Sequence, residues 1–309
     1  LGNIEPRPVF HTPKEEQWKS NFGDIPFLKE HEFSVEDELG RPNIIVSSPD
    51  CGASSIMRLS KKKTLGKPRQ NKSLNLVFRA ISVYEPQIFL IENLPKLLDF
   101  IPKAEFCLRF LKYHLIFHCH SVMEFGNSQK SRKRLVIIGI KKSSKFNPNS
   151  FTKIFRINEP KVARKLLEAV NLKGNFIPPM NKTLAMYDYR ELPKKENLTI
   201  KRIQELWTTD FKDEYKWPIK TAKMKTLPGV YRLKPEHYPM TVRPADRQFR
   251  PDGLPLGIQD MRRIMGIPKD FKLYIPRDED FLYYLNKARY TLCKGSVGEI
   301  GIWFKECLL

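Results

Sequence analysis

The alternation of short β-branched runs with amphipathic helical segments constrains the fold of this chain more than any other feature. Four apolar runs have the length of strands: 43–47, 87–91, 114–117 and 135–139. Apolar residues at helical spacing predict helices over 73–84 and 103–112. Strands that alternate with helices predict an α/β fold with an open, mostly parallel sheet.

Length and charge narrow the class of protein. The chain has 309 residues, enough for one large domain or two modest ones. Its longest apolar runs fall well short of the roughly 18 residues that a membrane-spanning helix needs. The net charge of +21 indicates an anionic partner. Nucleic acid is the first candidate for this partner, and an anionic membrane surface is the second. No basic amphipathic helix at a terminus supports the membrane interpretation.

Composition divides the chain into three parts. Residues 1–140 carry the strand and helix alternation, and residues 236–309 return to helix and turn patterns, with helices expected over 258–265 and 281–288. Residues 141–235 are irregular and hold 22 Lys and Arg against 9 Asp and Glu. We therefore expect a larger α/β domain, a smaller basic domain, and a C-terminal part that rejoins the first.

The cysteines and histidines favour structural roles. Five scattered cysteines, an odd number, fit a reducing compartment better than a disulfide framework. His118, Cys119 and His120 lie in an apolar strand pattern, where neighbours point to opposite faces. Such spacing rarely completes a tetrahedral metal site. This spacing leads us to expect no metal site. No secretory signal pattern is present, so we expect a cytoplasmic protein.

Side chains that can take part in catalysis or binding follow or precede three of the expected strands. Cys51 comes after the first run within a turn of small residues, and Glu92 and Asn93 follow the second. Arg132 and Arg134 lead into the run at 135–139. In open α/β sheets, ligands bind beyond the carboxyl ends of the strands. We therefore expect a thiol, a carboxyl and two guanidinium groups to line one cleft.

Taken together, these motifs resemble those of the DNA cytosine-5 methyltransferases, in the right order and across the whole chain. Five segments carry the resemblance: Ser48–Cys51 to the Pro-Cys nucleophile motif, Glu92–Leu94 to Glu-Asn-Val, Arg132–Arg134 to Gln-x-Arg-x-Arg, 247–268 to the motif after target recognition, and 294–297 to Gly-Asn-Ser-Val. The cysteine, glutamate and arginine set is the specific part. Phage and bacterial members are the most similar in character.

The resemblance implies a Rossmann-like methyltransferase domain with a target-recognition domain over 141–235. It implies transfer of a methyl group from S-adenosylmethionine to C5 of a cytosine flipped out of double-stranded DNA. Cys51 would add to C6 of the base as a thiolate. Glu92 would hold N3 and N4, and Arg132 or Arg134 would hold O2 and a phosphate.

The resemblance also implies a cofactor site and a DNA-contacting loop. The S-adenosylmethionine contacts would be Glu5, Asp24, Ile25, Pro49, Leu76, Ser296 and Val297. The loop 58–72 holds seven basic residues and no acid, and the DNA contacts expected from it are Arg58, Lys61, Lys62, Lys63, Lys67 and Arg69. We expect the protein to act as a monomer in the cytoplasm of a bacterium or a phage-infected host.

Three features depart from the family pattern. The glycine-rich Phe-x-Gly-x-Gly loop expected before Glu5 is absent from the four residues there, and we interpret this as a truncated start. Lys130 stands where the family has Gln, with Gln129 displaced by one position. The segment at 295–296 lacks the family's Asn.

Two alternative functions remain open on sequence alone. A chain without the glycine-rich loop could bind DNA without holding the cofactor. A related group methylates cytosine in tRNA, although the extended basic region favours DNA. A nicotinamide dehydrogenase is excluded because the glycines of 295–301 follow no strand and open no βαβ unit.

Overall fold

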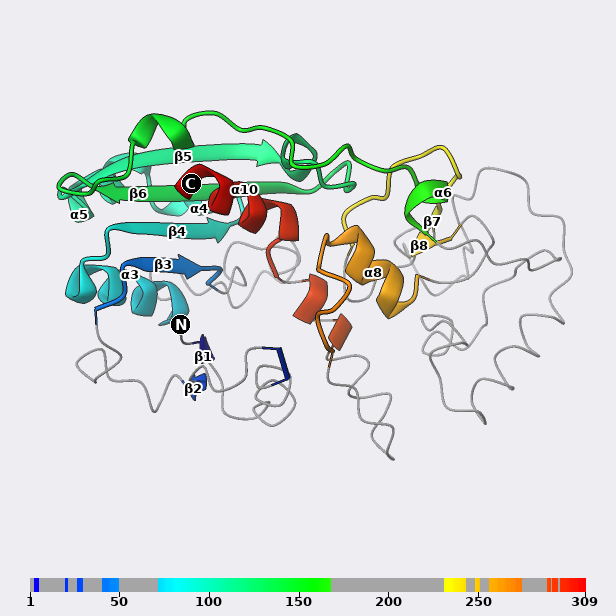
Figure 1. Ribbon diagram of the computed structural model, residues 1–309, viewed down its shortest axis with the longest axis horizontal. Helices are drawn as coiled ribbons and strands as arrows, with labels where there is room; N and C mark the ends of the chain where they lie inside the picture. Colours follow the sequence, from blue (N-terminus) through cyan, green and yellow to red (C-terminus); the bar gives the residue numbers. More distant parts are fainter. Residues whose placement is uncertain are drawn as a thin grey trace, which may run out of the picture. The chain divides into compact units, whose positions relative to one another are not determined.

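A computed structural model gives the fold of the chain (Figure 1). It describes residues 3–5, 20–21, 27–29, 41–49, 72–167, 231–242, 248–250, 256–273, 288–289, 291–293 and 295–309. Within these residues the chain folds into two compact units. The first comprises Leu1–Phe125, Arg132–Ile157 and Glu299–Leu309, and the second comprises Gly126–Ser131 and Asn158–Gly298.

A four-stranded sheet forms the centre of the first unit. Its strands are β3 (Ile44–Ser47), β4 (Ile88–Asn93), β5 (Tyr113–Ser121) and β6 (Lys133–Lys141), in the order β3-β4-β6-β5. β3 and β4 are parallel, whereas β6 runs antiparallel to both β4 and β5. The Rossmann-like α/β class predicted from the sequence is confirmed, but the sheet expected to be mostly parallel is mixed among the described strands, with a parallel part and an antiparallel part.

Helices cover one face of this sheet because each presents an apolar stripe to it. Three helices contribute: α3 (Lys72–Tyr84), α4 (Leu97–Phe100) and α5 (Lys103–Arg109). Phe78 of α3 and Phe106 of α5 meet edge to face, with ring centroids 5.6 Å apart. Both belong to one buried cluster with Phe89 of β4 and Ile137 of β6. This cluster ties the helices to the middle of the sheet.

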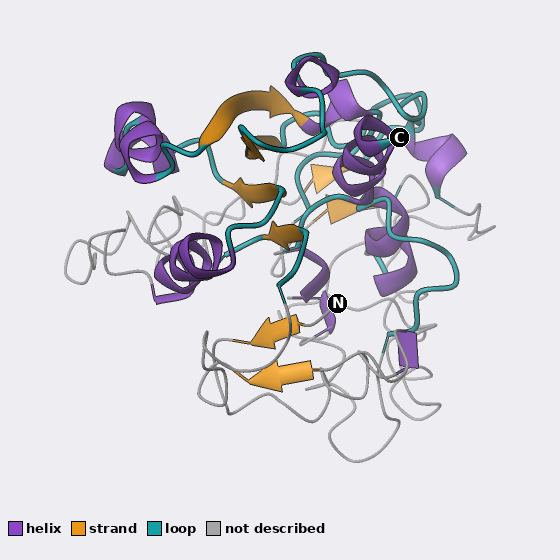
Figure 2. Ribbon diagram, turned by 60° about the vertical axis from the view of Figure 1, so that its left-hand side comes forward, coloured by secondary structure: helices purple, strands orange, loops and turns teal. Residues whose placement is uncertain are grey.

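The opposite face is covered by α10 (Gly298–Leu308), so helices and sheet form three layers (Figure 2). Trp303 is fully buried and packs against the rings of His118 in β5 and Phe125 in η3 (Val122–Phe125). Phe304 packs on Phe151 of η4 (Pro148–Phe151). The strand pattern around His118 is therefore confirmed as structural.

Shorter elements complete the described chain. In the first unit, β1 (Asn3–Glu5) pairs in parallel with β2 (Phe27–Lys29). In the second, β7 (Tyr231–Arg232) pairs in parallel with β8 (Gln248–Phe249), and α6 (Ala163–Leu166) and α8 (Ile258–Ile264) share a buried cluster. The expected helix over 281–288 lies almost entirely outside the described residues.

The end of α8 follows the sequence expectation closely. Gly266 adopts φ +66°, its N–H donates to the carbonyl of Arg263, and the N–H of Ile267 donates to that of Arg262. This pair of bonds is the Schellman motif, which needs a residue with positive φ at that point. A Cβ on Gly298 would lie 2.0 Å from the Gly266 carbonyl oxygen, so this close approach requires a glycine at 298, whereas the positive φ favours a glycine at 266.

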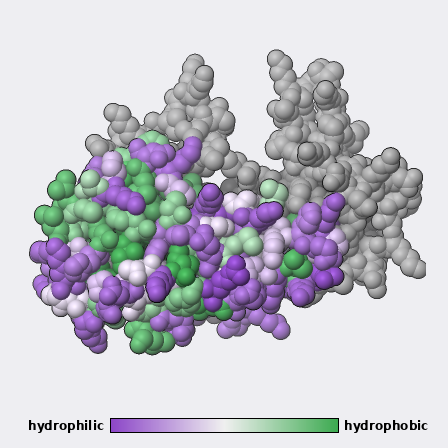
Figure 3. Space-filling view, turned by 90° about the horizontal axis from the view of Figure 1, so that it is seen from above, coloured by the Kyte–Doolittle hydropathy of each residue, from purple (hydrophilic) through white to green (hydrophobic). Residues whose placement is uncertain are grey.

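The face of the described residues that Figure 3 shows mixes apolar and polar side chains. Leu309, the last residue, is the most exposed large apolar side chain among the described residues at 92%, followed by Leu108 at 72% and Leu111 at 66%. Isolated exposed apolar residues of this kind are ordinary on soluble surfaces. Among the described helices, none combines the length and apolar character needed to cross a membrane.

Candidate active site

The ends of β3 and β4 and the start of β6 lie at one edge of the sheet. β3 and β4 are parallel, so their carboxyl ends coincide. β6 is antiparallel to β4, so its first residues lie beside the last residues of β4, with Glu92 opposite Val136 and Asn93 opposite Leu135. The strand order and directions therefore bring Ser48, Glu92 and Arg134 to the same edge.

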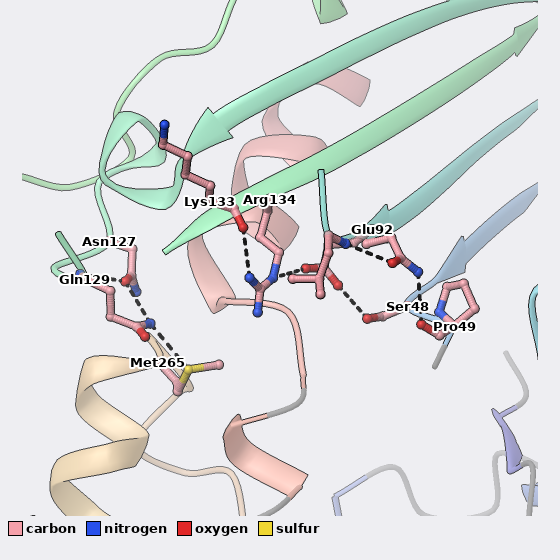
Figure 4. A network of polar contacts seen from close by, with 10 residues as sticks. Ser48, Pro49, Glu92, Asn127, Gln129, Lys133, Arg134 and Met265 are labelled. Carbon is pink, nitrogen blue, oxygen red and sulfur yellow. Dashed lines mark hydrogen bonds and ion pairs between the residues drawn. The ribbon is translucent and has the colours of Figure 1, made fainter. Parts of the chain in front are cut away.

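The Glu92 carboxyl is held from both neighbouring strands (Figure 4). The hydroxyl of Ser48, directly after β3, donates to Oε2 of Glu92 at 2.5 Å. Nε of Arg134, the second residue of β6, forms an ion pair with Oε1 at 2.6 Å. The Glu92 side chain is only 4% exposed. A buried carboxylate needs such a charged partner, because desolvation alone would penalise it.

Asn93 fastens the end of β3 to the end of β4. Its Nδ2 donates to the carbonyl oxygen of Pro49 at 3.2 Å, and its Oδ1 accepts from the N–H of Leu94 at 2.8 Å. Asn93 and Pro49 are both buried. The backbone that leads from Pro49 toward Cys51 is thus anchored before it leaves the described residues.

The two arginines have different environments. Arg134 combines its contact to Glu92 with a bond from Nη1 to the carbonyl oxygen of Lys133 at 2.8 Å, and its side chain is 11% exposed. Arg132 is buried, and its carbonyl accepts from the N–H of Val122. The structure thus brings Arg134 to Glu92, while Arg132 lies in the protein interior.

The segment before these arginines is anchored separately, within the second unit. Gln129 is fully buried; its Nε2 donates to Oδ1 of Asn127 at 3.2 Å, and its Oε1 accepts from the N–H of Val242 at 3.0 Å. Asn127 donates to the carbonyl of Ile264 at 2.9 Å. Figure 4 shows Gln129 between Asn127 and Met265 of the same unit, whose sulfur lies 3.4 Å from Nε2 of Gln129. Lys130, in contrast, is exposed.

The expected cofactor residues are described only in part. Glu5 ends β1, Pro49 is buried after β3, and Leu76 is half-buried on α3. Val297 is buried, and Ser296 is half-buried with its Oγ out of contact with solvent. Asp24 and Ile25 lie outside the described residues.

The nucleophile candidate and the basic loop also lie outside the described residues. Cys51 is one of these, as are the expected DNA contacts Arg58, Lys61, Lys62, Lys63, Lys67 and Arg69. Within the part of the chain that the structure describes, no group of three or more His, Cys, Asp or Glu is suited to a metal ion.

Sequence reasoning missed two contacts at this edge, those of Ser48 with Glu92 and of Asn93 with Pro49. The motifs single out Ser48 only as part of the Ser48–Cys51 segment, and Asn93 only as the neighbour of Glu92. Their positions within motifs at two strand ends were the available signal. Which atoms meet depends on the register of β3 with β4, in which Ser47 pairs with Ile91.

Comparison with known proteins identifies the family. The family model for C-5 cytosine-specific DNA methylases matches residues 10–284, most of the chain. No curated protein matched in a sequence search.

Solved structures share the fold at low sequence identity. A candidate DNA modification methyltransferase encoded within an E. coli prophage matches with a TM-score of 0.59 and 15% identity, covering 99% of this chain and 91% of that one. A mutant DNMT2 from Spodoptera frugiperda matches with a TM-score of 0.55 and 11% identity, covering 100% and 91%. S. pombe Dnmt2 gives 0.52 and 12%, covering 99% and 89%. The chain belongs to the C-5 cytosine-specific DNA methylase family, whose members methylate cytosine at C5 with S-adenosylmethionine as the methyl donor.

Proposed function

We propose that this chain methylates C5 of a cytosine flipped out of double-stranded DNA, through a covalent bond between Cys51 and C6 of the base. The observation that carries the proposal is the buried Glu92 carboxyl, which accepts a hydrogen bond from Ser48 and forms an ion pair with Arg134 at the edge where β3 and β4 end. Cys51 follows Ser48 by three residues along the chain. A nucleophile and a base-binding carboxyl at neighbouring strand ends are what this reaction requires.

The thiolate makes an unreactive carbon reactive. Cytosine C5 is a poor nucleophile, but a bond from the sulfur of Cys51 to C6 moves an electron pair toward C5. C5 then takes the methyl group, and S-adenosylmethionine supplies that group as an electrophile when bound. Loss of the C5 proton to a solvent base and cleavage of the sulfur–C6 bond restore the aromatic ring and the free thiolate.

Glu92 is suited to hold the base during these steps. Its Oε1 is buried and accepts no hydrogen bond within the described part of the chain, although Arg134 lies beside it. A buried acceptor with spare capacity is completed by a ligand donor, here the N4 amino group of cytosine. Negative charge that develops on the ring is then offset by the Arg134 guanidinium, and we assign O2 or a phosphate to Arg132 or Arg134.

Residues of the chain fit the methyl donor in type. We assign Glu5, the last residue of β1, to the ribose hydroxyls of the donor, because an acid that follows a strand accepts from these hydroxyls in dinucleotide-binding folds. The buried Oγ of Ser296 has no hydrogen-bond partner among the described residues, so it has capacity for a polar ligand atom. With these we assign Asp24, Ile25, Pro49, Leu76 and Val297 to the donor.

The basic segments supply the remaining contacts. We assign the loop 58–72 to the phosphates that flank the flipped base, and residues 141–235 to reading the target sequence in a groove. Both roles use the positive charge concentrated in these segments. We expect one copy of the chain to act alone, in the cytoplasm.

Covalent trapping tests the proposal. A duplex in which 5-fluorocytosine replaces cytosine should stay bonded to the chain in the presence of S-adenosylmethionine, because fluorine at C5 cannot leave as a proton. We expect a denaturant-resistant protein–DNA band with the wild type and none with Cys51→Ser. An equal band in the variant, or no band with the wild type on a randomised duplex library, would contradict the covalent mechanism.

A further inference from the structure

The Ser48 hydroxyl makes the second of the two contacts that fix the Glu92 carboxyl. Its Oγ donates to Oε2 at 2.5 Å, a short bond typical of a hydroxyl and a charged acceptor. Building on the proposed function, we propose that Ser48 is a positioning residue for methyl transfer, which orients Glu92 toward the base. Ser48 lies outside the expected catalytic set of Cys51, Glu92, Arg132 and Arg134.

One contact alone leaves the carboxyl free to turn. The Arg134 ion pair engages Oε1 only, through Nε, while Nη1 of the same guanidinium is used by the Lys133 carbonyl. The terminal torsion of a glutamate is broad, so a single-point contact does not define the plane of its carboxyl group. Ser48 engages the other oxygen from the opposite neighbouring strand, and two contacts on different oxygens define that plane.

The same contact decides which oxygen serves the base. Ser48 donates to Oε2, whereas the buried Oε1 has the Arg134 Nε 2.6 Å away as an ion-pair partner but accepts no bond of hydrogen-bonding geometry within the described residues, so it keeps a lone pair for a further donor. The carboxyl is therefore presented with Oε1 available to the amino group of cytosine.

Ser48 also links the end of β3, which leads toward Cys51, to the Glu92 carboxyl in β4. It stands immediately before Pro49, whose carbonyl oxygen is held by Asn93. Two bonds between adjacent residue pairs, Ser48 to Glu92 and Asn93 to Pro49, thus join the ends of β3 and β4. Removal of the Ser48 hydroxyl leaves the hydrogen bond from Asn93 to the Pro49 carbonyl in place, so the change acts on the Glu92 carboxyl.

The experiment compares two shape-matched variants of the full chain. Ser48→Thr keeps a hydroxyl at the same carbon, and Ser48→Val replaces that hydroxyl with a methyl group at nearly equal volume. Ser47→Ala is the matched control, because the neighbouring hydroxyl donates to the carbonyl of Leu90 at 3.2 Å and does not touch Glu92. kcat and KM for methyl transfer to DNA are measured for all three, with thermal unfolding recorded alongside.

We expect kcat to fall about 10- to 100-fold in Ser48→Val, the loss expected for a hydrogen bond to a charged group. KM for DNA and the unfolding midpoint should stay near the wild-type values, and Ser48→Thr should recover most of the rate. If Ser48→Val and Ser48→Thr have the same kcat, or if Ser47→Ala loses as much of kcat as Ser48→Val, Ser48 has no positioning role. A wild-type chain that transfers no methyl group would overturn the proposed function itself, and this inference with it.

Discussion

Single side chains at the edge of the sheet carry most of the chemistry proposed for this chain. Arg132 and Arg134 are equivalent in sequence terms, yet only Arg134 forms an ion pair with Glu92, while Arg132 is buried at 1% exposure. The spacing of the two arginines predicts that both lie near the carboxyl but does not distinguish them. The distinction comes from the turn before β6, where Arg132 also bonds through its backbone to Val122.

Glu85, which lies between α3 and β4, is an ionisable group outside the site with a strongly shifted pKa. It forms ion pairs with Lys112 and Lys141, and its backbone has φ +46°, uncommon for a residue with a side chain. Its bonds to Lys112 and then Lys141 lower the pKa of Glu85 from 4.5 to about 2. The ionised form is thus favoured in the folded protein.

This pKa predicts an acid-sensitive contribution to stability. Between pH 4.5 and about 2 the unfolded chain takes up a proton that folded Glu85 does not, so the contribution is complete above pH 4.5 and is lost as the pH falls toward 2. Urea unfolding of the wild type and Glu85→Gln should therefore differ at pH 6 and converge near pH 2. Because Glu85 is partly exposed, the difference should shrink in high salt. A difference that does not change with pH would contradict the assignment.

At the scale of elements, sequence periodicity predicted much of the fold. The helices over 73–84 and 258–265 appear as α3 and α8 within one or two residues, and the four apolar runs became β3 to β6. The direction of β6 differs from the mostly parallel sheet expected from the sequence, because alternation along a strand carries no information about its orientation. That direction matters, since only an antiparallel β6 places Arg134 beside Glu92.

The close packing of β4 against β6 depends on one glycine. Gly139 lies opposite Phe89, and a Cβ built on it would meet ring carbons of Phe89 at 2.2 Å. We expect Gly139→Ala to lower the free energy of unfolding by about 1–3 kcal/mol, as overpacking of a core does. Urea titration measures this, with Gly301→Ala in α10 as control, because a Cβ at that position would meet no atom within 4 Å.

The control should be neutral or stabilising by about 0.5–1 kcal/mol, since alanine is preferred over glycine inside a helix. Adding Phe89→Leu to Gly139→Ala should restore part of the loss by removing the ring that clashes. A Gly139→Ala protein as stable as the wild type would mean that the sheet adjusts without strain.

Across the whole molecule, the positive charge is concentrated in one part of the chain. The net charge is +21, and residues 141–235, which lie mostly in the second unit, contribute 22 Lys and Arg against 9 Asp and Glu. The three-part division of the chain, with target recognition over 141–235, stays a prediction. Sequence could indicate that this region meets an anion, but the bases that it reads depend on loop geometry that composition does not encode.

Methyl transfer itself tests the account most directly. The chain is incubated with methyl-labelled S-adenosylmethionine and either duplex DNA or tRNA, and the nucleic acid is digested and analysed for 5-methylcytosine by mass spectrometry. The account predicts labelled 5-methylcytosine in DNA with the wild type, and none with Cys51→Ser. Label confined to tRNA would contradict DNA as the substrate, and label that persists in Cys51→Ser would contradict the nucleophile on which the mechanism rests.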